Sequence, residues 1–376
     1  MSERWRTIAG AVAFAGAALL VGCGGAAAQS GTWRSSHTDH GRRVDIEVRG
    51  EVDFTEDDRD VARLSSDGRI SIEEAVAGRP DRRVEFRPDA RGGVQRLYYE
   101  DGVQRTPDAD DRAWIEQMVL GVVRRSGLGS EHRVARLRAR NGVDGVLREI
   151  DQLEGDGGKR QYYAALLRSP GLRADETARI LRHAGRVIDS DSEKRYVLAR
   201  ALERASLGPA EMAALLEAAA TIRSDSEKRY VLARALELGP GPAELAALLD
   251  VAAGISSDGE RTYVLVRVAR ADPLADARVR RAFFHQAEGI SSDSELARLL
   301  LTVLRRDGAR DDAVAAAVRA SEHISSDGER ARVLVSVPER SLRSEAVRDA
   351  FERAMDGIGS GGERARVARW FARAAT

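Results

Sequence analysis

The sequence predicts a mostly α-helical protein: a right-handed α-solenoid of helix–turn–helix repeats of about 34 residues, preceded by a small antiparallel β domain. Two observations lead to this prediction. A Ser-x-x-Glu tract recurs at nearly constant spacing in the later part of the chain, and polar and apolar residues alternate in the earlier part. These patterns divide the chain into a signal region over 1–28, a linker over 29–42, the β domain over 43–107 and the repeat array over 108–376.

The composition excludes several classes of protein. The 376 residues carry 60 basic and 60 acidic side chains, which gives a formal net charge of zero. We therefore expect no nucleic-acid partner, because nucleic-acid-binding proteins usually have a basic excess. A single cysteine excludes an intramolecular disulfide and any metal site built from several thiolates.

The start of the chain has the pattern of an export signal. A positively charged start precedes an apolar run over residues 8–21, shorter than the ~20 residues that cross a bilayer. Residues 20–23, Leu-Val-Gly-Cys, resemble the lipobox of bacterial lipoproteins, which implies acyl chains on Cys23 and a membrane-anchored protein of the cell envelope or periplasm. The run Ala-Ala-Ala at 26–28 is the alternative cleavage site and implies a secreted or soluble periplasmic protein. The mass of the mature N-terminus separates the two.

The segment over 29–42 is rich in Gly, Ser and Thr, which favours a flexible tether. It contains His37 and His40, but two histidines without a third ligand are too few for a metal site, so we expect no metal here.

Residues 43–107 have the pattern of strands. Val44, Ile46 and Val48 alternate with charged residues, as expected when one face of a sheet is buried. About five such segments, separated by Gly and Pro, predict a small antiparallel meander or half-barrel. The acidic tract Glu56–Asp60 lacks the spacing of a calcium loop and is interpreted as a solvated turn.

The recurring tract is the strongest signal in the chain. It occurs as Ser190–Glu193, Ser224–Glu227, Ser257–Glu260, Ser292–Glu295, Ser326–Glu329 and Ser360–Glu363, with the glutamates 34, 33, 35, 34 and 34 residues apart. Ser followed three residues later by Glu is typical of a capping box, which predicts that each tract starts a helix. Hydrophobic residues four, five, eight and nine positions after the glutamate predict its buried face.

An Ala-rich second helix is predicted in each unit. These second helices are expected at 210–222, 243–255, 275–290, 311–324 and 344–358, each ending in an isoleucine two residues before the next tract. We expect these isoleucines, Ile222 and Ile255 among them, to be buried at the junctions between units. Helices at 110–125, 131–140 and 143–153 open the array and one at 360–374 ends it, while the prolines, such as Pro209 and Pro242, are expected in the linkers.

The repeats resemble the HEAT, armadillo and tetratricopeptide class of α-solenoids in period and helix pairing. The sequence pattern Ile-x-Ser-Asp-x-Glu-Lys-Arg is clearest at 188–195 and 222–229. It is similar to repeats of uncharacterised exported bacterial proteins. It is also similar to arrays attached to some membrane metallopeptidases of the antibiotic-receptor type. The resemblance implies a role in protein–protein interaction. The chain contains no His-Glu-x-x-His motif, so the peptidase activity is not expected here.

Two columns of residues are candidates for a binding surface. The first contains Tyr196, Tyr230 and Tyr263, with Arg200, Arg234 and Arg267 one helical turn later. Tyr and Arg frequently anchor protein interfaces, although packing of the Tyr rings between units is the alternative. The second column is basic, and three of its members are Lys159, Lys194 and Lys228. It is interpreted as a row of ion pairs with the Asp three residues earlier, rather than as an anion-binding ladder.

No motif of a known enzyme class, cofactor or phosphate loop is found in the sequence. We therefore expect a non-enzymatic exported scaffold or adaptor that binds another protein or an envelope component through its repeats, without a cofactor. Two alternatives remain open: a sensory or regulatory ectodomain acting beside a membrane peptidase or receptor, and an enzyme that uses the carboxylates of the tract Glu56–Asp60.

Overall fold

The computed structural model describes residues 32–39, 41–204, 206–271 and 273–374. The chain divides into two compact units. The β unit contains the described residues up to Glu51 together with Leu64–Gly102. The helical unit contains Val52–Arg63 and the residues from Val103 onward. A mostly helical chain with an N-terminal antiparallel sheet was predicted and is confirmed. Cys23 and the rest of the signal region lie outside the described residues. No helix in the described ranges has the length and apolar character needed to span a bilayer.

Six strands form one antiparallel sheet in the order β1-β2-β5-β6-β7-β8. They are β1 Trp33–Asp39, β2 Arg42–Arg49, β5 Arg69–Val76, β6 Arg82–Pro88, β7 Val94–Glu100 and β8 Val103–Arg105. The register places Ile46 opposite Ile72, Ile72 opposite Val84 and Val84 opposite Tyr98. All four side chains are buried, so the predicted alternation of apolar and polar residues is confirmed along this row.

Strand β1 lies in the segment that the sequence analysis assigned to a flexible tether. It pairs along its whole length with β2, from Trp33 opposite Val48 to Asp39 opposite Arg42. Its residues show no apolar alternation, since most of its described side chains are exposed. The prediction of a linker over these residues is therefore wrong: main-chain hydrogen bonds to β2 order them without the help of a hydrophobic face.

The remaining two strands, β3 Val52–Phe54 and β4 Val61–Leu64, form a separate two-stranded sheet. All of this hairpin except Leu64 belongs to the helical unit rather than to the β unit. The loop of the hairpin carries the acidic tract, which is considered below with the contacts that it makes to helix α2.

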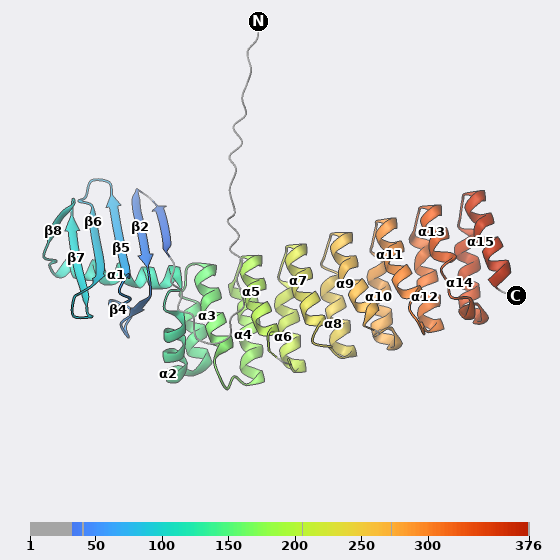
Figure 1. Ribbon diagram of the computed structural model, residues 1–376, viewed down its shortest axis with the longest axis horizontal. Coiled ribbons are helices and arrows are strands. Elements are labelled where there is room, and N and C mark those ends of the chain that lie inside the picture. The colour runs from blue at the N-terminus through green and yellow to red at the C-terminus, as the bar shows by residue number, and fades with distance from the viewer. Residues whose placement is uncertain (1–31, 40, 205, 272, 375–376) are drawn as a thin grey trace, which may run out of the picture. The chain divides into compact units, whose positions relative to one another are not determined.

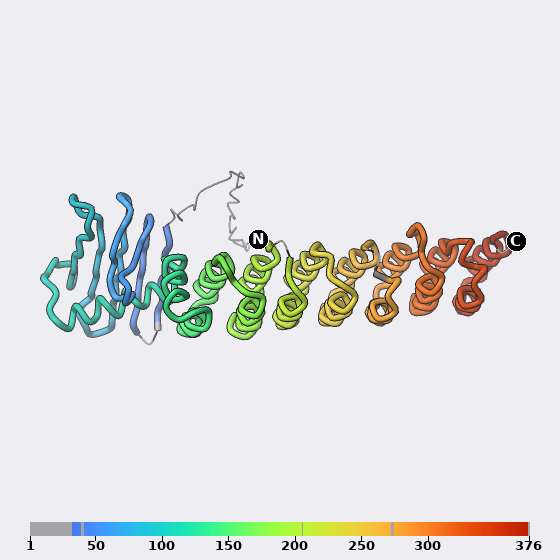
Figure 2. The backbone as a smooth tube through the Cα atoms, turned by 90° about the horizontal axis from the view of Figure 1, so that it is seen from below, coloured from blue at the N-terminus to red at the C-terminus, as the bar shows by residue number. Residues whose placement is uncertain are grey.

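The helices of the helical unit alternate between two rows (Figure 1; Figure 2). The first row contains α1 Ala109–Ser126, α3 Asp156–Arg168, α5 Asp191–Leu202, α7 Asp225–Leu236, α9 Asp258–Arg270, α11 Asp293–Leu304, α13 Asp327–Leu334 and α15 Gly361–Ala374. The second row contains α2 Ser130–Ile150, α4 Ala174–Val187, α6 Pro209–Ala220, α8 Pro242–Ala252, α10 Ala277–Glu288, α12 Asp311–Ala320 and α14 Glu345–Asp356. Within a row, each helix packs against the next one, α5 against α7 and α6 against α8, for example.

The helix boundaries follow the repeat pattern closely, with two differences. Gly142 has φ 65° and ψ −168°, which interrupts α2 between the two helices that were predicted there. Pro209 and Pro242 do not lie in linkers but are the first residues of α6 and α8. The first position of a helix accepts proline because its N–H has no partner within the helix.

The isoleucine that precedes each tract is buried in every unit. Its exposed fraction is 4% or less at Ile188, Ile222, Ile255, Ile290, Ile324 and Ile358. The predicted burial is confirmed, but the residue is not part of the second helix. α6 ends at Ala220 and Ile222 follows in the short connection to the next unit, where it fills the space between successive helix pairs.

The tract itself caps the first-row helix, but not as a complete capping box. The Ser190 hydroxyl accepts a hydrogen bond from the N–H of Glu193, as predicted. The Ser190 N–H, however, donates to the carboxylate of Asp156 in the preceding unit at 2.7 Å, and not to Glu193. The same bond from a tract serine to the Asp one unit earlier recurs at 2.6–2.8 Å in the next five units. Each helix start is therefore completed by the unit before it.

Replacing Asp225 by alanine is expected to lower the free energy of unfolding by about 2 kcal/mol. Its carboxylate accepts hydrogen bonds from Ser256 N at 3.1 Å and Ser257 N at 2.8 Å, and both donors would lose a charged acceptor. Asp250→Ala, at an exposed position of α8, is the matched control and should change stability by less than about 0.5 kcal/mol. Equal losses in urea unfolding for both variants would contradict the assigned role of Asp225.

The basic column caps helix ends and does not form the predicted row of ion pairs. Of its described members, Lys159 does pair with Asp156 at 3.2 Å. Lys194 and Lys228 are only 4% and 5% exposed, and burial lowers the pKa of Lys194. The Lys228 ammonium donates to Gly254 O at 2.9 Å, beyond the end of α8. In the preceding unit, the Lys194 ammonium makes the equivalent contact with the Thr221 hydroxyl at 2.9 Å. Lys228 therefore ties the start of α7 to the end of α8.

Candidate functional site: the exposed face of the first helix row

Three tyrosines of successive first-row helices are exposed at the surface. Tyr196 on α5 is 51% exposed, Tyr230 on α7 is 37% exposed and Tyr263 on α9 is 38% exposed. Each occupies the same place in its unit, and α5, α7 and α9 contact one another in order. The structure thus brings the three predicted tyrosines onto one face, and their exposure is inconsistent with rings packed inside the array.

Arginines stack on these rings and connect one unit to the next. The guanidinium carbon of Arg195 lies 4.1 Å from the centroid of the Tyr196 ring and 4.8 Å from that of Tyr230. Arg229 lies 4.7 Å from the Tyr263 ring, in the same relation between units. Each such contact is worth about 0.5–1 kcal/mol at an exposed site. The rings are therefore held in place although they face solvent.

The stacking arginines are also ion-paired with the glutamates of the tracts. The three pairs, each formed with the following unit, are Arg160 with Glu193, Arg195 with Glu227 and Arg229 with Glu260. The tract glutamate, expected to complete a capping box, instead holds the guanidinium that supports a tyrosine. We call the surface formed by the three tyrosines and these three arginines the tyrosine strip.

The predicted arginine partners occupy the same face but mostly contact other residues. Arg200 forms an ion pair with Glu203, and Arg234 forms one with Glu237. Of the three, Arg267 does contact its tyrosine: its guanidinium donates to the Tyr263 hydroxyl at 3.2 Å and lies 5.7 Å from the ring. The predicted tyrosines and arginines therefore share one face, but the arginines that stack on the rings were not predicted. They come directly before a tyrosine in the chain or from the preceding unit.

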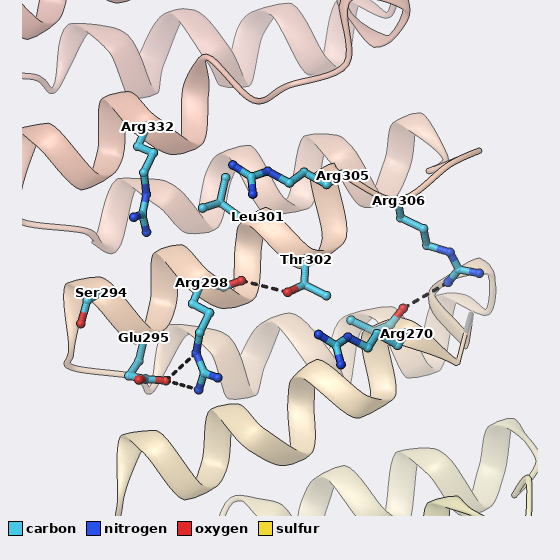
Figure 3. Close-up of a pocket in the computed structure, with 10 residues that line it drawn as sticks. Arg270, Ser294, Glu295, Arg298, Leu301, Thr302, Arg305, Arg306 and Arg332 are labelled. Carbon is cyan, nitrogen blue, oxygen red and sulfur yellow. Dashed lines mark hydrogen bonds and ion pairs between the residues drawn. The ribbon is translucent and has the colours of Figure 1, made fainter.

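The tyrosine column becomes an arginine column further along the row. Arg298 on α11, Arg332 on α13 and Arg366 on α15 stand where the earlier units have tyrosine. Beside Arg298 and Arg332, the surface has a hollow of about 720 Å³ between α9, α11 and α13. Its lining includes Arg270 and Arg305, whose side chains extend along the same opening (Figure 3). We call this surface the arginine hollow.

The acidic tract of the hairpin, the candidate catalytic segment, is bound to helix α2. Glu56 forms an ion pair with Arg140 at 2.6 Å, and Asp57 accepts a hydrogen bond from the Thr55 hydroxyl at 2.6 Å. Glu56 and Asp57 are exposed, as expected of a solvated turn, but Asp58 is only 8% exposed, so the prediction is wrong for that residue. The tract connects the hairpin to the first helices of the array.

Asp58 lies in a buried network of charges. Its carboxylate is 2.7 Å from the guanidinium of Arg133 and 3.2 Å from that of Arg136. Arg133 also contacts Glu149 at 2.7 Å and donates to the Tyr162 hydroxyl at 2.7 Å. Burial raises the pKa of Asp58 despite the two arginines, and burial likewise raises the pKa of Tyr162. These contacts hold the tract, and with it the hairpin, against helix α2.

One histidine of the array lies in a Tyr–His–Asp chain. His183 Nδ1 is 2.5 Å from the Tyr163 hydroxyl, and His183 Nε2 is 3.2 Å from a carboxylate oxygen of Asp151. Burial lowers the pKa of His183, and Tyr163 is fully buried. A substrate therefore has no access to the Tyr163 hydroxyl. The three hydrogen-bonded residues link the second-row helices α2 and α4 to α3.

No protein-family model, no curated protein and no solved structure matches the chain.

Proposed function

We propose that this chain is a non-enzymatic scaffold or adaptor that binds another protein, or a component of the cell envelope, through the exposed face of its first helix row. The helical unit is then a right-handed α-solenoid with HEAT-like repeats. The contacts of each helix with the next one in its row support this proposal, because stacked helix pairs offer a long continuous side face for binding.

The observation that carries the proposal is the exposure of Tyr196, Tyr230 and Tyr263 on three adjacent helices. Tyr and Arg are enriched among the residues that dominate binding energy at protein interfaces. The arginines stacked on these rings restrict their motion, so that little side-chain entropy remains to be lost when a partner binds. The tyrosine strip therefore has the residue composition of a binding surface, and its side chains are already held in place before a partner binds.

We place the protein in the cell envelope, anchored to a membrane through acyl chains on Cys23. The support is the apolar run before Cys23 and the lipobox-like residues 20–23. Two or more chains on one residue hold a protein at a membrane far more firmly than a single chain does. The scaffold would then collect its partner at a membrane surface.

Replacing the three tyrosines together by serine is expected to weaken binding of the partner by about a hundredfold or more, because interface anchors of this type each contribute about 2 kcal/mol. The partner is first obtained by photo-crosslinking in the native envelope, with benzoylphenylalanine in place of Tyr230. The affinity of the purified partner for each variant is then measured by calorimetry, and circular dichroism checks the fold.

The control uses exposed residues of the other row. Arg278, Arg281 and His285 lie on α10, and their replacement by serine should leave the affinity unchanged. Benzoylphenylalanine at position 285 should likewise give no crosslink to the same partner. If the tyrosine variant binds as tightly as the unchanged protein, or if both positions crosslink equally, the assignment of the binding face is wrong.

A further inference from the structure

The arginine hollow has a local excess of positive charge. Five arginines and one glutamate are among the residues that line it: Arg270, Arg298, Arg305, Arg306, Arg332 and Glu295. The chain as a whole has no net charge, so this excess is local. Like charges gathered in one hollow repel one another, and an anionic ligand would remove this cost.

Two arginines of the hollow form only weak, exposed ion pairs. Arg298 pairs with Glu295 and Arg332 pairs with Glu329, both as exposed pairs three residues apart on one helix. Pairs of this kind contribute only a few tenths of a kcal/mol. Among the described residues, Arg270 and Arg305 form no ion pair, and both side chains are exposed.

These arginines also differ from those that maintain the array. Arg261 and Arg330 donate to main-chain carbonyls at the ends of second-row helices, and Arg195 is held by Glu227. Arg306 resembles that group, because it donates to Ala269 O at 3.1 Å. Arg270 and Arg305 make no comparable contact, and the column to which Arg298 and Arg332 belong holds tyrosine in the earlier units. Arg270 lies in the last turn of α9 and Arg305 directly follows α11, where the helix dipole favours a positive charge by about 0.3–1 kcal/mol, and no hydrogen bond or ion pair of the described residues holds these two side chains.

The arrangement of the charges indicates the form of the ligand. The guanidinium groups come from three successive helices, which stand about 8–10 Å apart in such packing. A single phosphate would need donors that converge on one point. A peptide in the polyproline II conformation has three residues per turn and rises about 3.1 Å per residue, so that every third side chain lies on one face, about 9 Å from the last, and can reach the next helix. Nucleic acid would need a basic stripe continuing along the row, but in the tyrosine strip the arginines are paired with Glu193, Glu227 and Glu260.

We propose that the arginine hollow binds an acidic segment of a partner protein in the polyproline II conformation, with Asp or Glu at about every third residue. Leu301 and Thr302 line the hollow between the charged groups and can contact the intervening residues. The proposal extends the proposed function, since the same partner can contact the tyrosine strip with an adjoining segment. It does not depend on that strip, because the acidic segment can be tested alone.

The test uses the full chain and a fluorescent peptide of about twelve residues with Glu at every third position and Gly between. The control peptide has Gln in place of Glu. Fluorescence anisotropy is expected to show binding at least about tenfold tighter for the Glu peptide. This binding should weaken strongly from about 0.1 M to about 1 M salt, as the Debye length falls from about 10 Å to about 3 Å. Equal binding of the two peptides would overturn the proposal.

The variant Arg270→Gln/Arg305→Gln should lower the affinity for the Glu peptide by about tenfold or more. Arg278→Gln/Arg281→Gln on α10 removes the same charge from exposed positions of the other row and should leave the affinity unchanged. An equal loss in both variants would show attraction by net charge alone and contradict a specific site. Tighter binding of inorganic phosphate or of a single-stranded oligonucleotide than of the Glu peptide would also contradict it.

The two proposals can fail separately. The variant in which serine replaces Tyr196, Tyr230 and Tyr263 is expected to keep its affinity for the Glu peptide. If that variant loses the native partner while the unchanged chain does not bind the Glu peptide, the proposal for the arginine hollow is wrong and the proposed function stands. If the Glu peptide binds and the tyrosine variant keeps its partner, the proposed function is wrong and the proposal for the arginine hollow stands.

Discussion

Replacing Arg133 by methionine is expected to lower the free energy of unfolding by about 3–5 kcal/mol. The guanidinium of Arg133 lies between Asp58 and Glu149, at 2.7 Å from each, and holds the Tyr162 hydroxyl. Methionine keeps much of the apolar volume but leaves two carboxylates largely buried without this partner. The loss should appear in urea unfolding, and hydrogen exchange should show faster opening of the hairpin Val52–Leu64.

Arg136→Met is the matched control on the same helix. Arg136 contacts Asp58 at 3.2 Å and is more exposed than Arg133, so its loss should cost about 1 kcal/mol or less. Adding Asp58→Asn to Arg133→Met should recover part of the lost stability, because one buried charge is then removed. If the double variant is less stable than Arg133→Met, the network does not act through the charge of Asp58.

Replacing Ile222 or Ile255 by alanine should each cost about 2–4 kcal/mol of unfolding free energy. The two side chains are 1% and 0% exposed and lie in the continuous core between successive helix pairs. Alanine would leave a cavity there, because helices on both sides of the junction are held by other contacts. Arg223→Ala, at the exposed position directly after Ile222, should change stability by less than about 0.5 kcal/mol. A loss of this small size for Ile222→Ala would mean that the junctions are not closely packed.

The helices and their buried face could be predicted because the signal is local and repeated. A tract serine, an isoleucine two residues earlier and apolar positions along one helix face recur in six units, so that each copy supports the others. Strand β1 could not be predicted in this way. Its residues, Trp-Arg-Ser-Ser-His-Thr-Asp, have no apolar alternation, and its pairing with β2 depends on the main chain, which side-chain patterns do not report.

The candidate face could be predicted only in part. Side chains one residue apart point away from each other on a helix, and this favours Arg200, one turn along, as the neighbour of Tyr196. The stacking of Arg195 on both Tyr196 and Tyr230 requires the distance between α5 and α7, which no single-helix pattern contains. The arginine hollow did leave a signal in the aligned copies, where tyrosine gives way to arginine at position 298. That Arg270 and Arg305, at helix ends, line the same hollow could not be predicted, because it depends on how the helices of the row pack together.

The hydrogen bond from each tract serine to the Asp of the preceding unit gives the array a direction and makes it modular. Suppose that one whole unit is excised, from one tract Asp to the residue before the next tract Asp. Each remaining tract serine can then still donate to the Asp of the unit before it, so that no donor is left without an acceptor. The number of units can therefore change during evolution, or by engineering, in whole steps that keep this hydrogen bond at the new junction. Gly361, the first residue of α15, occupies the Asp position in the last copy, so an engineered extension beyond this helix would first need an aspartate there.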